Sequence, residues 1–148
     1  MADIINNIVG GRYYILELIG RGGSAIVYKA RDIHNGGIYA LKKYITSDPA
    51  NRKRLLEGME RELEVLKNCT HPVLPKIFDL IKIEDAFFLV MEYIDGIDLK
   101  KYVDEYGTLS TKMLIKVMEQ VCSGFYYLHS LSPAIVYRDL KPANIILC

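Results

Sequence analysis

The sequence predicts an α+β fold, in which an antiparallel sheet with one helix is followed by a helical part. Up to residue 94, short runs of apolar and β-branched residues alternate with turn residues, which is typical of strands joined by hairpins. Asn35-Gly36 between two such runs is a strong hairpin signal. After Asp95-Gly96 the apolar residues recur every three or four positions, which is the period of a helix. We therefore expect the boundary between the two parts at Asp95.

Five strands and one helix are expected in the first part. The strands are predicted over residues 13–20, 25–31, 37–43, 76–83 and 86–94. Between the third and the fourth strand, residues 51–68 predict a helix, because their leucines and a methionine follow at helical spacing. Residues 1–10 precede the first strand and are expected to form an N-terminal tail.

Two helices are expected after the boundary. The shorter one begins near Leu99 and ends at Gly107, because glycine is common just past the last turn of a helix. The longer one covers residues 111–131, and either Ser110 or Thr111 caps its first turn.

Composition excludes several classes of protein. The 148 residues are 51% hydrophobic and 25% charged, with a net charge of +1, so no nucleic acid partner is expected. No signal peptide is expected, because the first residues lack a basic stretch followed by an apolar one. No apolar run approaches the ~20 residues that cross a bilayer. The three cysteines lie far apart, so reduced thiols are expected. The expected location is the cytoplasm, either as such or as the cytosolic portion of a longer membrane protein.

Two glycines, Gly20 and Gly22, lie between the first two expected strands. Glycines in such a turn let backbone N–H groups approach a phosphate without an intervening Cβ. Ala25 stands where a third glycine would complete a G-x-G-x-x-G pattern, and a strand rather than a helix follows. A Rossmann fingerprint is therefore not indicated, and the pattern alone also fits a plain glycine hairpin.

Lys42 lies in the third expected strand and shares a face with Ala40, because residues two apart in a strand point the same way. If the glycine turn covers a nucleotide, Lys42 can reach the phosphates; otherwise it is a solvated lysine, as expected for Lys43. A lysine among apolar strands needs an opposite charge nearby. Several glutamates of the helix over 51–68 could supply it, and spacing alone leaves the choice open, although Glu62 adjoins the inward face.

The segment YRDLKPAN, residues 137–144, carries the strongest signal. The carboxylate of Asp139 can orient an attacking hydroxyl and accept its proton, and Lys141 can neutralise a transferring phosphoryl group. Asn144 can offer a carbonyl oxygen to Mg²⁺, which prefers hard oxygen ligands. The alternative is a surface loop with a random charged run, but the spacing matches a signature of several residues.

Taken in this order, the motifs resemble the eukaryotic-type protein kinases over nearly all of residues 11–148. The resemblance implies a kinase N-lobe with its hinge over residues 11–94 and a partial C-lobe over residues 95–148. Lysine at position 141 resembles the serine/threonine class. Tyr137, in place of the usual histidine, resembles a variant among bacterial members.

The resemblance also implies roles for individual residues. Asp139 matches the catalytic base, Lys141 the lysine of the γ-phosphate and Asn144 a metal ligand. Lys42 matches the lysine that holds the α- and β-phosphates, and Glu62 matches its helix partner. The remaining nucleotide-binding positions are the glycine loop (Gly20, Gly22, Ala25), the adenine pocket (Ile19, Val27, Ala40, Met91, Ile146), the hinge (Glu92, Ile94) and an acid near the ribose (Asp98).

These matches predict an ATP-dependent serine/threonine kinase that transfers a phosphoryl group from Mg-ATP to a protein hydroxyl. The family's D-F-G motif, whose aspartate binds Mg²⁺, does not occur among the 148 residues, so negligible transfer is expected from this chain alone. The same absence favours the alternative, a non-catalytic nucleotide-binding or interaction module. Apolar faces of the long helix and of NIILC predict a homo-oligomer.

Overall fold

The computed structural model describes residues 4–22, 25–44, 66–83, 86–137 and 139–148. The chain divides into two compact units. The first comprises Met1–Cys69 and Pro75–Tyr93, and the second comprises Thr70–Leu74 and Ile94–Cys148. The units therefore divide one residue before the expected boundary, and a short segment ahead of the fourth expected strand belongs to the second unit.

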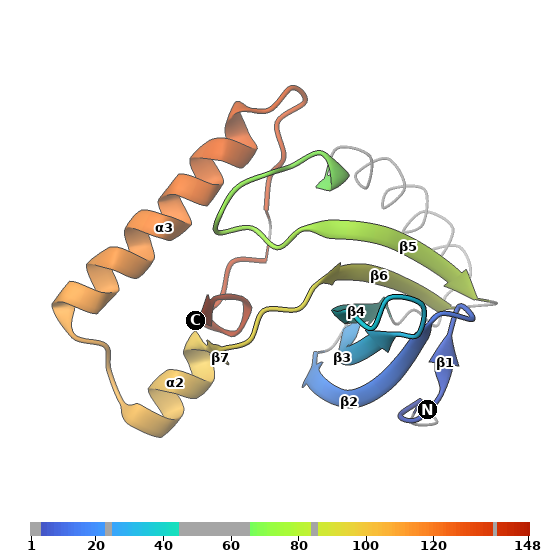
Figure 1. Ribbon diagram of the computed structural model, residues 1–148. Coiled ribbons are helices and arrows are strands. Elements are labelled where there is room, and N and C mark those ends of the chain that lie inside the picture. Colours follow the sequence, from blue (N-terminus) through green and yellow to red (C-terminus); the bar gives the residue numbers. More distant parts are fainter. Residues whose placement is uncertain (1–3, 23–24, 45–65, 84–85, 138) are drawn as a thin grey trace. The chain divides into compact units, whose positions relative to one another are not determined.

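A six-stranded antiparallel sheet forms the first unit, with the order β1-β2-β3-β4-β6-β5 (Figure 1). Its strands are β1 (Ile8–Val9), β2 (Tyr13–Arg21), β3 (Ala25–Asp32), β4 (Ile38–Tyr44), β5 (Ile77–Ile83) and β6 (Ala86–Glu92). The five expected strands are confirmed to within two residues at each end. The sheet has one strand more than expected, because residues 8 and 9 of the expected tail pair with β2.

The hydrophobic core of the first unit lies on one face of this sheet. Ile15, Leu41 and Val90 are fully buried there, and alternate residues of β3 point the same way. Val9 belongs to this core, and Ile4 and Ile5 pack against it. Burial of these three side chains explains why the start of the chain joins the sheet, since the hydrophobic effect favours covering the apolar face.

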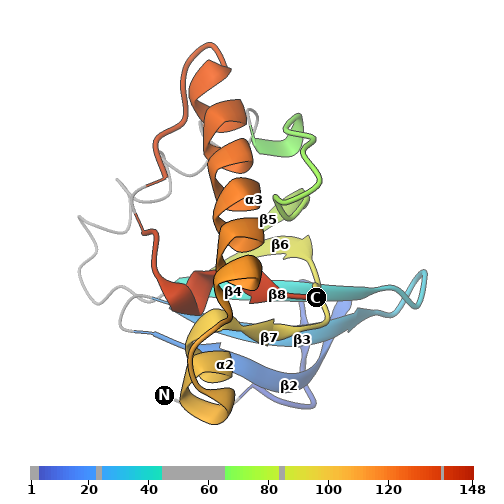
Figure 2. The same cartoon turned by 90° about the vertical axis from the view of Figure 1, so that its left-hand side faces the viewer.

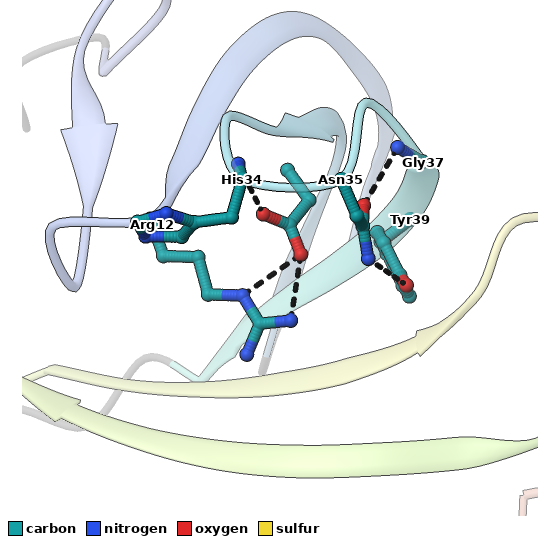
Figure 3. Close-up of polar contacts among 6 residues, drawn as sticks. Arg12, His34, Asn35, Gly37 and Tyr39 are labelled. Atoms are coloured by element: carbon teal, nitrogen blue, oxygen red, sulfur yellow. Dashed lines mark hydrogen bonds and ion pairs between the residues drawn. The ribbon is translucent and has the colours of Figure 1, made fainter.

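The turn between β3 and β4 is fixed by a buried carboxylate (Figure 3). Asp32 is fully buried and accepts hydrogen bonds from the Arg12 guanidinium, 2.8 Å from Nε, and from the His34 backbone N–H at 2.9 Å. Asn35 Oδ1 accepts from the N–H of Gly37 at 2.8 Å, and Gly36 has a φ of 73°. The predicted Asn-Gly turn is confirmed, because these residues close it by the side-chain bond and positive φ that such turns need.

The second unit contains two helices, α2 (Leu99–Tyr106) and α3 (Thr111–Ser130), and both confirm the prediction. Ser110 is the cap of α3, since its Oγ accepts from the N–H of Met113 at 3.3 Å. Gly107 ends α2 with a φ of 84°, and its N–H donates to the carbonyl of Val103. Figure 2 shows a further small sheet beside α2, formed by β7 (Ile97–Asp98) and β8 (Ile146–Leu147).

The segment Thr70–Leu74 is bound to α3. The Thr70 N–H donates to the Tyr127 hydroxyl at 3.0 Å, and the His71 ring stacks on Tyr127 with 5.2 Å between centroids. Val73 packs so closely on the helix that a Cβ at Gly124 would lie 2.9 Å from its Cγ2. These contacts explain why the segment belongs to the second unit.

The helix predicted over residues 51–68 lies largely outside the described residues, and only Leu66 and Lys67 of it are described as helical. In the described part of the chain, no helix is long and apolar enough to cross a membrane.

Candidate active site

The loop of residues 139–144 brings three predicted site residues together. Lys141 Nζ lies 2.9 Å from both carboxylate oxygens of Asp139. The amide nitrogen of Asn144 donates to the Asp139 carbonyl at 2.7 Å and to its Oδ2 at 3.0 Å. The side chain of Asp139 is nevertheless 61% exposed. The loop therefore presents an oriented carboxylate to solvent, with a cation beside it.

The C-terminal end of this loop is held by a short turn and a strand. Pro142–Asn144 form a 3₁₀ turn, whose start suits the fixed φ of proline. The Asn144 N–H donates to the Lys141 carbonyl at 2.9 Å, and the Ile145 carbonyl accepts from the Leu99 N–H at 2.8 Å. The loop is thus tied to the start of α2, next to the point where β8 pairs with β7.

Gly96 is a residue of this site that sequence reasoning missed. A Cβ at this position would collide with the carbonyl oxygen of Leu147 and would lie 2.7 Å from Ile146 Cγ2. Only glycine therefore lets β7 and β8 approach closely. The sequence predicts a boundary at Asp95-Gly96, but nothing local indicates the contact of Gly96 with Ile146 and Leu147.

Tyr137 precedes the loop and packs on α3, with its ring centroid 6.0 Å from that of Phe125. Burial raises the pKa of the Tyr137 phenol, and the negative charge of Asp139 raises it further. A hydrogen bond with Asn144 and the charge of Lys141 act in the opposite direction. The side chain therefore remains a neutral phenol that packs the loop against the helix.

The glycine turn connects β2 to β3 in the first unit. The N–H of Gly22 donates to the Ala25 carbonyl at 2.8 Å, and Gly20 lies opposite Val27. Neither glycine has a positive φ, and a Cβ on either would make only ordinary contacts of 3.7 Å or more. The described part of the turn thus does not itself require glycine at positions 20 and 22.

Lys42 and Ala40 lie on the face of the sheet opposite to the core. Lys42 is directly across from Val27 on β3, and Ala40 is across from Met91 on β6. Ala40 is nearly buried, whereas Val27 and Met91 are half-buried. Lys43 points to the other face, with its Nζ 5.6 Å from the centre of the Phe88 ring. The register therefore groups four of the predicted nucleotide-binding residues on one face.

Three other predicted site residues have structural contacts of their own, and one lies outside the described residues. The N–H of Glu92 donates to the Lys76 carbonyl at 2.8 Å, and its carboxylate accepts from the Lys76 N–H. Asp98 caps α2, with Oδ1 accepting from the Lys101 N–H at 2.9 Å. Ile146 pairs with Asp98 across the small sheet and is 42% exposed. Glu62 falls in the part of the chain that the structure does not describe.

The predicted site residues are divided between the two units. Those from Ile19 to Glu92 belong to the first unit, and those from Ile94 to Ile146 belong to the second. In the first unit, Val27, Ala40, Lys42 and Met91 share one sheet face. In the second unit, Asp139, Lys141 and Asn144 lie together in one loop.

Comparison with known proteins identifies the family. The model of the protein kinase domain matches residues 13–148. The chain is 37% identical over 144 residues to serine/threonine-protein kinase PrkC of Bacillus subtilis and 32% identical over 143 residues to the probable serine/threonine-protein kinase PknB of Lactococcus lactis. Each alignment covers 97% of this chain and 22% of the relative, so the chain spans about a fifth of the length of these kinases.

Relatives occur outside bacteria as well. The chain is 34% identical over 141 residues to the human serine/threonine-protein kinase tousled-like 1. This alignment covers 92% of the chain and 18% of the relative. A solved structure of Rad53 residues 1–466 in complex with AMP-PNP matches with a TM-score of 0.78 and 31% identity, over 92% of this chain and 34% of that one. The sheet, the two helices and the loop around Asp139 are therefore those of a protein kinase, and the chain belongs to the protein kinase domain family, with serine/threonine kinases as its relatives.

Proposed function

We propose that the protein to which this chain belongs transfers the γ-phosphoryl group of Mg-ATP to a serine or threonine hydroxyl of a protein substrate. The observation that carries the proposal is the contact of Asp139 with Lys141 and Asn144 on an exposed loop. A carboxylate with a purely structural role is usually buried. Asp139 instead faces solvent while two donors fix its orientation, which suits contact with a substrate.

The geometry of Asp139 suits the orientation of an attacking hydroxyl. Lys141 and Asn144 both contact the carboxylate, whose side chain is 61% exposed, so a substrate can approach it from solvent. An oriented carboxylate can accept the hydroxyl proton as the oxygen attacks phosphorus. Because phosphoryl transfer depends mainly on positioning and charge neutralisation, the ammonium of Lys141 would stabilise the negative charge of the transferring group.

The amide of Asn144 fits a magnesium site. Its nitrogen is directed at Asp139, so the carbonyl oxygen is the atom that Asn144 would present to a cation. Carboxamide and carboxylate oxygens are the hard ligands that Mg²⁺ takes in proteins. When bound, the ion would neutralise charge on the phosphates.

The nucleotide-binding part of the proposal rests on the first unit. Since the described turn does not require Gly20 and Gly22 for its own conformation, their absent side chains are better explained by a ligand that approaches the backbone from outside. Lys42 shares the face of Val27 and Ala40 and would bind the phosphates, with the backbone of Glu92 bonding the adenine. The Rad53 structure supports this assignment, because a protein of the same fold was solved with an ATP analogue.

Two measurements test the proposal. On residues 1–148, ATP with Mg²⁺ should raise the melting temperature, and Lys42→Met should abolish the rise while the exposed control Lys112→Met keeps it. On the complete protein, transfer of ³²P to casein should fall at least about a hundredfold in Asp139→Asn, which removes the proton acceptor. The control Asp104→Asn changes an exposed carboxylate of α2 and should leave the rate intact.

The two measurements also separate the alternatives. If the complete protein binds ATP but transfers no phosphate even before substitution, it is a nucleotide-binding module and not a kinase. A rate that is unaffected by Asp139→Asn would contradict the assigned role of the loop.

A further inference from the structure

Lys29, in the middle of β3, contacts the residue that follows the end of β6. Its Nζ lies 4.5 Å from the centre of the Tyr93 ring and 3.4 Å from Glu17 Oε1 on β2. Its side chain is 26% exposed, so the ammonium is partly removed from water. None of the nucleotide-binding roles proposed above includes Lys29.

The strand register explains how this contact arises. Lys29 lies directly opposite Glu17 on β2 and opposite Ala40 on β4, and Ala40 lies opposite Met91 on β6. These four residues form one row across four strands, on the same face as Lys42, because directly paired residues of antiparallel strands point the same way. The member of the row on β4 is alanine, whose short side chain lets Lys29 extend over that strand to the segment after Met91.

The contact is electrostatically favourable. The polar contact with Tyr93 raises the pKa of the Lys29 ammonium, and Glu17 raises it further, while partial burial opposes them. Lys29 therefore stays charged at neutral pH. A charged ammonium over the face of a tyrosine ring is attracted by the ring quadrupole, and more strongly where water is partly excluded.

We propose that Lys29 is a positioning residue, which holds Tyr93 and thereby the adjoining backbone of Glu92 in place for the adenine base of ATP. The adenine part of this inference rests on the proposed function. The contact itself involves residues of the first unit alone. Glu17 steadies the ammonium from the strand that leads into the glycine turn.

The test compares Lys29→Met with Lys29→Arg and with Arg31→Met, each in residues 1–148. Methionine keeps an unbranched apolar stem but removes the charge, and arginine can still bind both an aromatic face and a carboxylate. Arg31 is an exposed cation on the same strand and the same face, two residues further on, and serves as the matched control.

Two properties are measured for each variant. The first is hydrogen exchange of the Glu92 and Tyr93 amides without nucleotide, and the second is the dissociation constant for ATP, obtained by competition with a fluorescent ATP analogue. Lys29→Met should speed the exchange and weaken ATP binding about two- to fivefold, as expected for loss of one cation–π contact. Lys29→Arg and Arg31→Met should leave both properties close to those of the unchanged chain.

A double variant identifies the route of the effect. Lys29→Met combined with Tyr93→Leu should bind ATP no more weakly than Tyr93→Leu alone, because the lysine acts through the tyrosine. Unchanged exchange and affinity in Lys29→Met, or fully additive losses in the double variant, would overturn the inference. Failure of the unchanged chain to bind ATP would overturn the proposed function and the adenine part of the inference, while faster exchange in Lys29→Met would still support the Tyr93 contact.

Discussion

The guanidinium of Arg12 holds the carboxylate of Asp32 in place. The Asp32 side chain is fully buried at the end of β3, and Arg12 Nη2 lies 2.7 Å from its Oδ2. Hydrogen bonds from Arg12 lower the pKa of the carboxyl, the N–H of His34 lowers it further, and burial opposes both. The Ile33 N–H also donates to the Arg12 carbonyl at 2.9 Å, so this pair joins the β3–β4 turn to the start of β2.

The lowered pKa predicts how stability depends on pH. A carboxyl whose pKa is lower in the folded state stabilises the fold above its unfolded pKa of about 3.9, and this contribution is lost as pH falls through the folded pKa. Asp32→Asn should therefore lower the melting temperature at pH 7 by roughly 5 °C, and the difference from the unchanged chain should narrow below about pH 4. Thermal melts between pH 3 and 7 measure the drop in melting temperature and its change with pH, with Asp104→Asn as control. A drop that stays constant with pH would contradict the role of the Asp32 charge.

Single residues also show where sequence reasoning succeeds and where it does not. Asp139, Lys141 and Asn144 could be predicted because a short loop fixes their spacing along the chain. The contact of Lys29 with Tyr93 could not, since it joins residues 64 positions apart through the register of four strands. The capping role of Asp98 could likewise not be predicted, because an aspartate ahead of a helix can either cap the helix or bind a ligand.

The small sheet of β7 and β8 holds the end of the loop of residues 139–144. It contains only two residues per strand, and Gly96 lets it form because a side chain there would meet the Leu147 carbonyl. A two-residue strand has no hydrophobic period, so neither β7 nor β1 could be predicted from sequence. The apolar run NIILC, which contains β8, is strand-like in sequence, and β8 confirms it. The longer strands and both helices could be predicted, because their periodicity, caps and turn residues are local.

A side chain at position 96 should separate the two strands of this sheet. Gly96→Ala should speed hydrogen exchange of the Leu99 amide, which donates to Ile145, and should reduce transfer by the complete protein about tenfold, since misplacement by 1 Å is costly. Gly124→Ala is the matched comparison, because its Cβ would come too close to a methyl group of Val73, which can move, and would make ordinary contacts with Leu74. It should leave the Leu99 exchange unchanged. Equal exchange in both variants would show that Gly96 is not needed for the pairing.

At the scale of the whole molecule, α3 has two different faces. Val117, Gly124 and Leu128 are buried, whereas Leu114, Met118 and Tyr126 are exposed. These three lie on one i+4 row, which runs from beside the buried face to the opposite side of the helix. Ile115, Val136 and Leu140 of the same unit are also more than half exposed. Large exposed apolar patches are unusual on monomeric proteins and favour association.

We therefore expect residues 1–148 to associate with themselves when expressed alone. Sedimentation velocity should show dimers or larger species that increase with concentration, since burial of apolar surface drives the contact. Met118→Glu should shift the distribution to monomer, because association would then bury an unpaired carboxylate. The matched control Glu119→Gln alters an exposed neighbour of Met118 without adding charge to the exposed apolar residues of α3. This variant should associate as before. A single monomeric species of the unchanged chain at high concentration would mean that the exposed side of α3 is compatible with an isolated molecule.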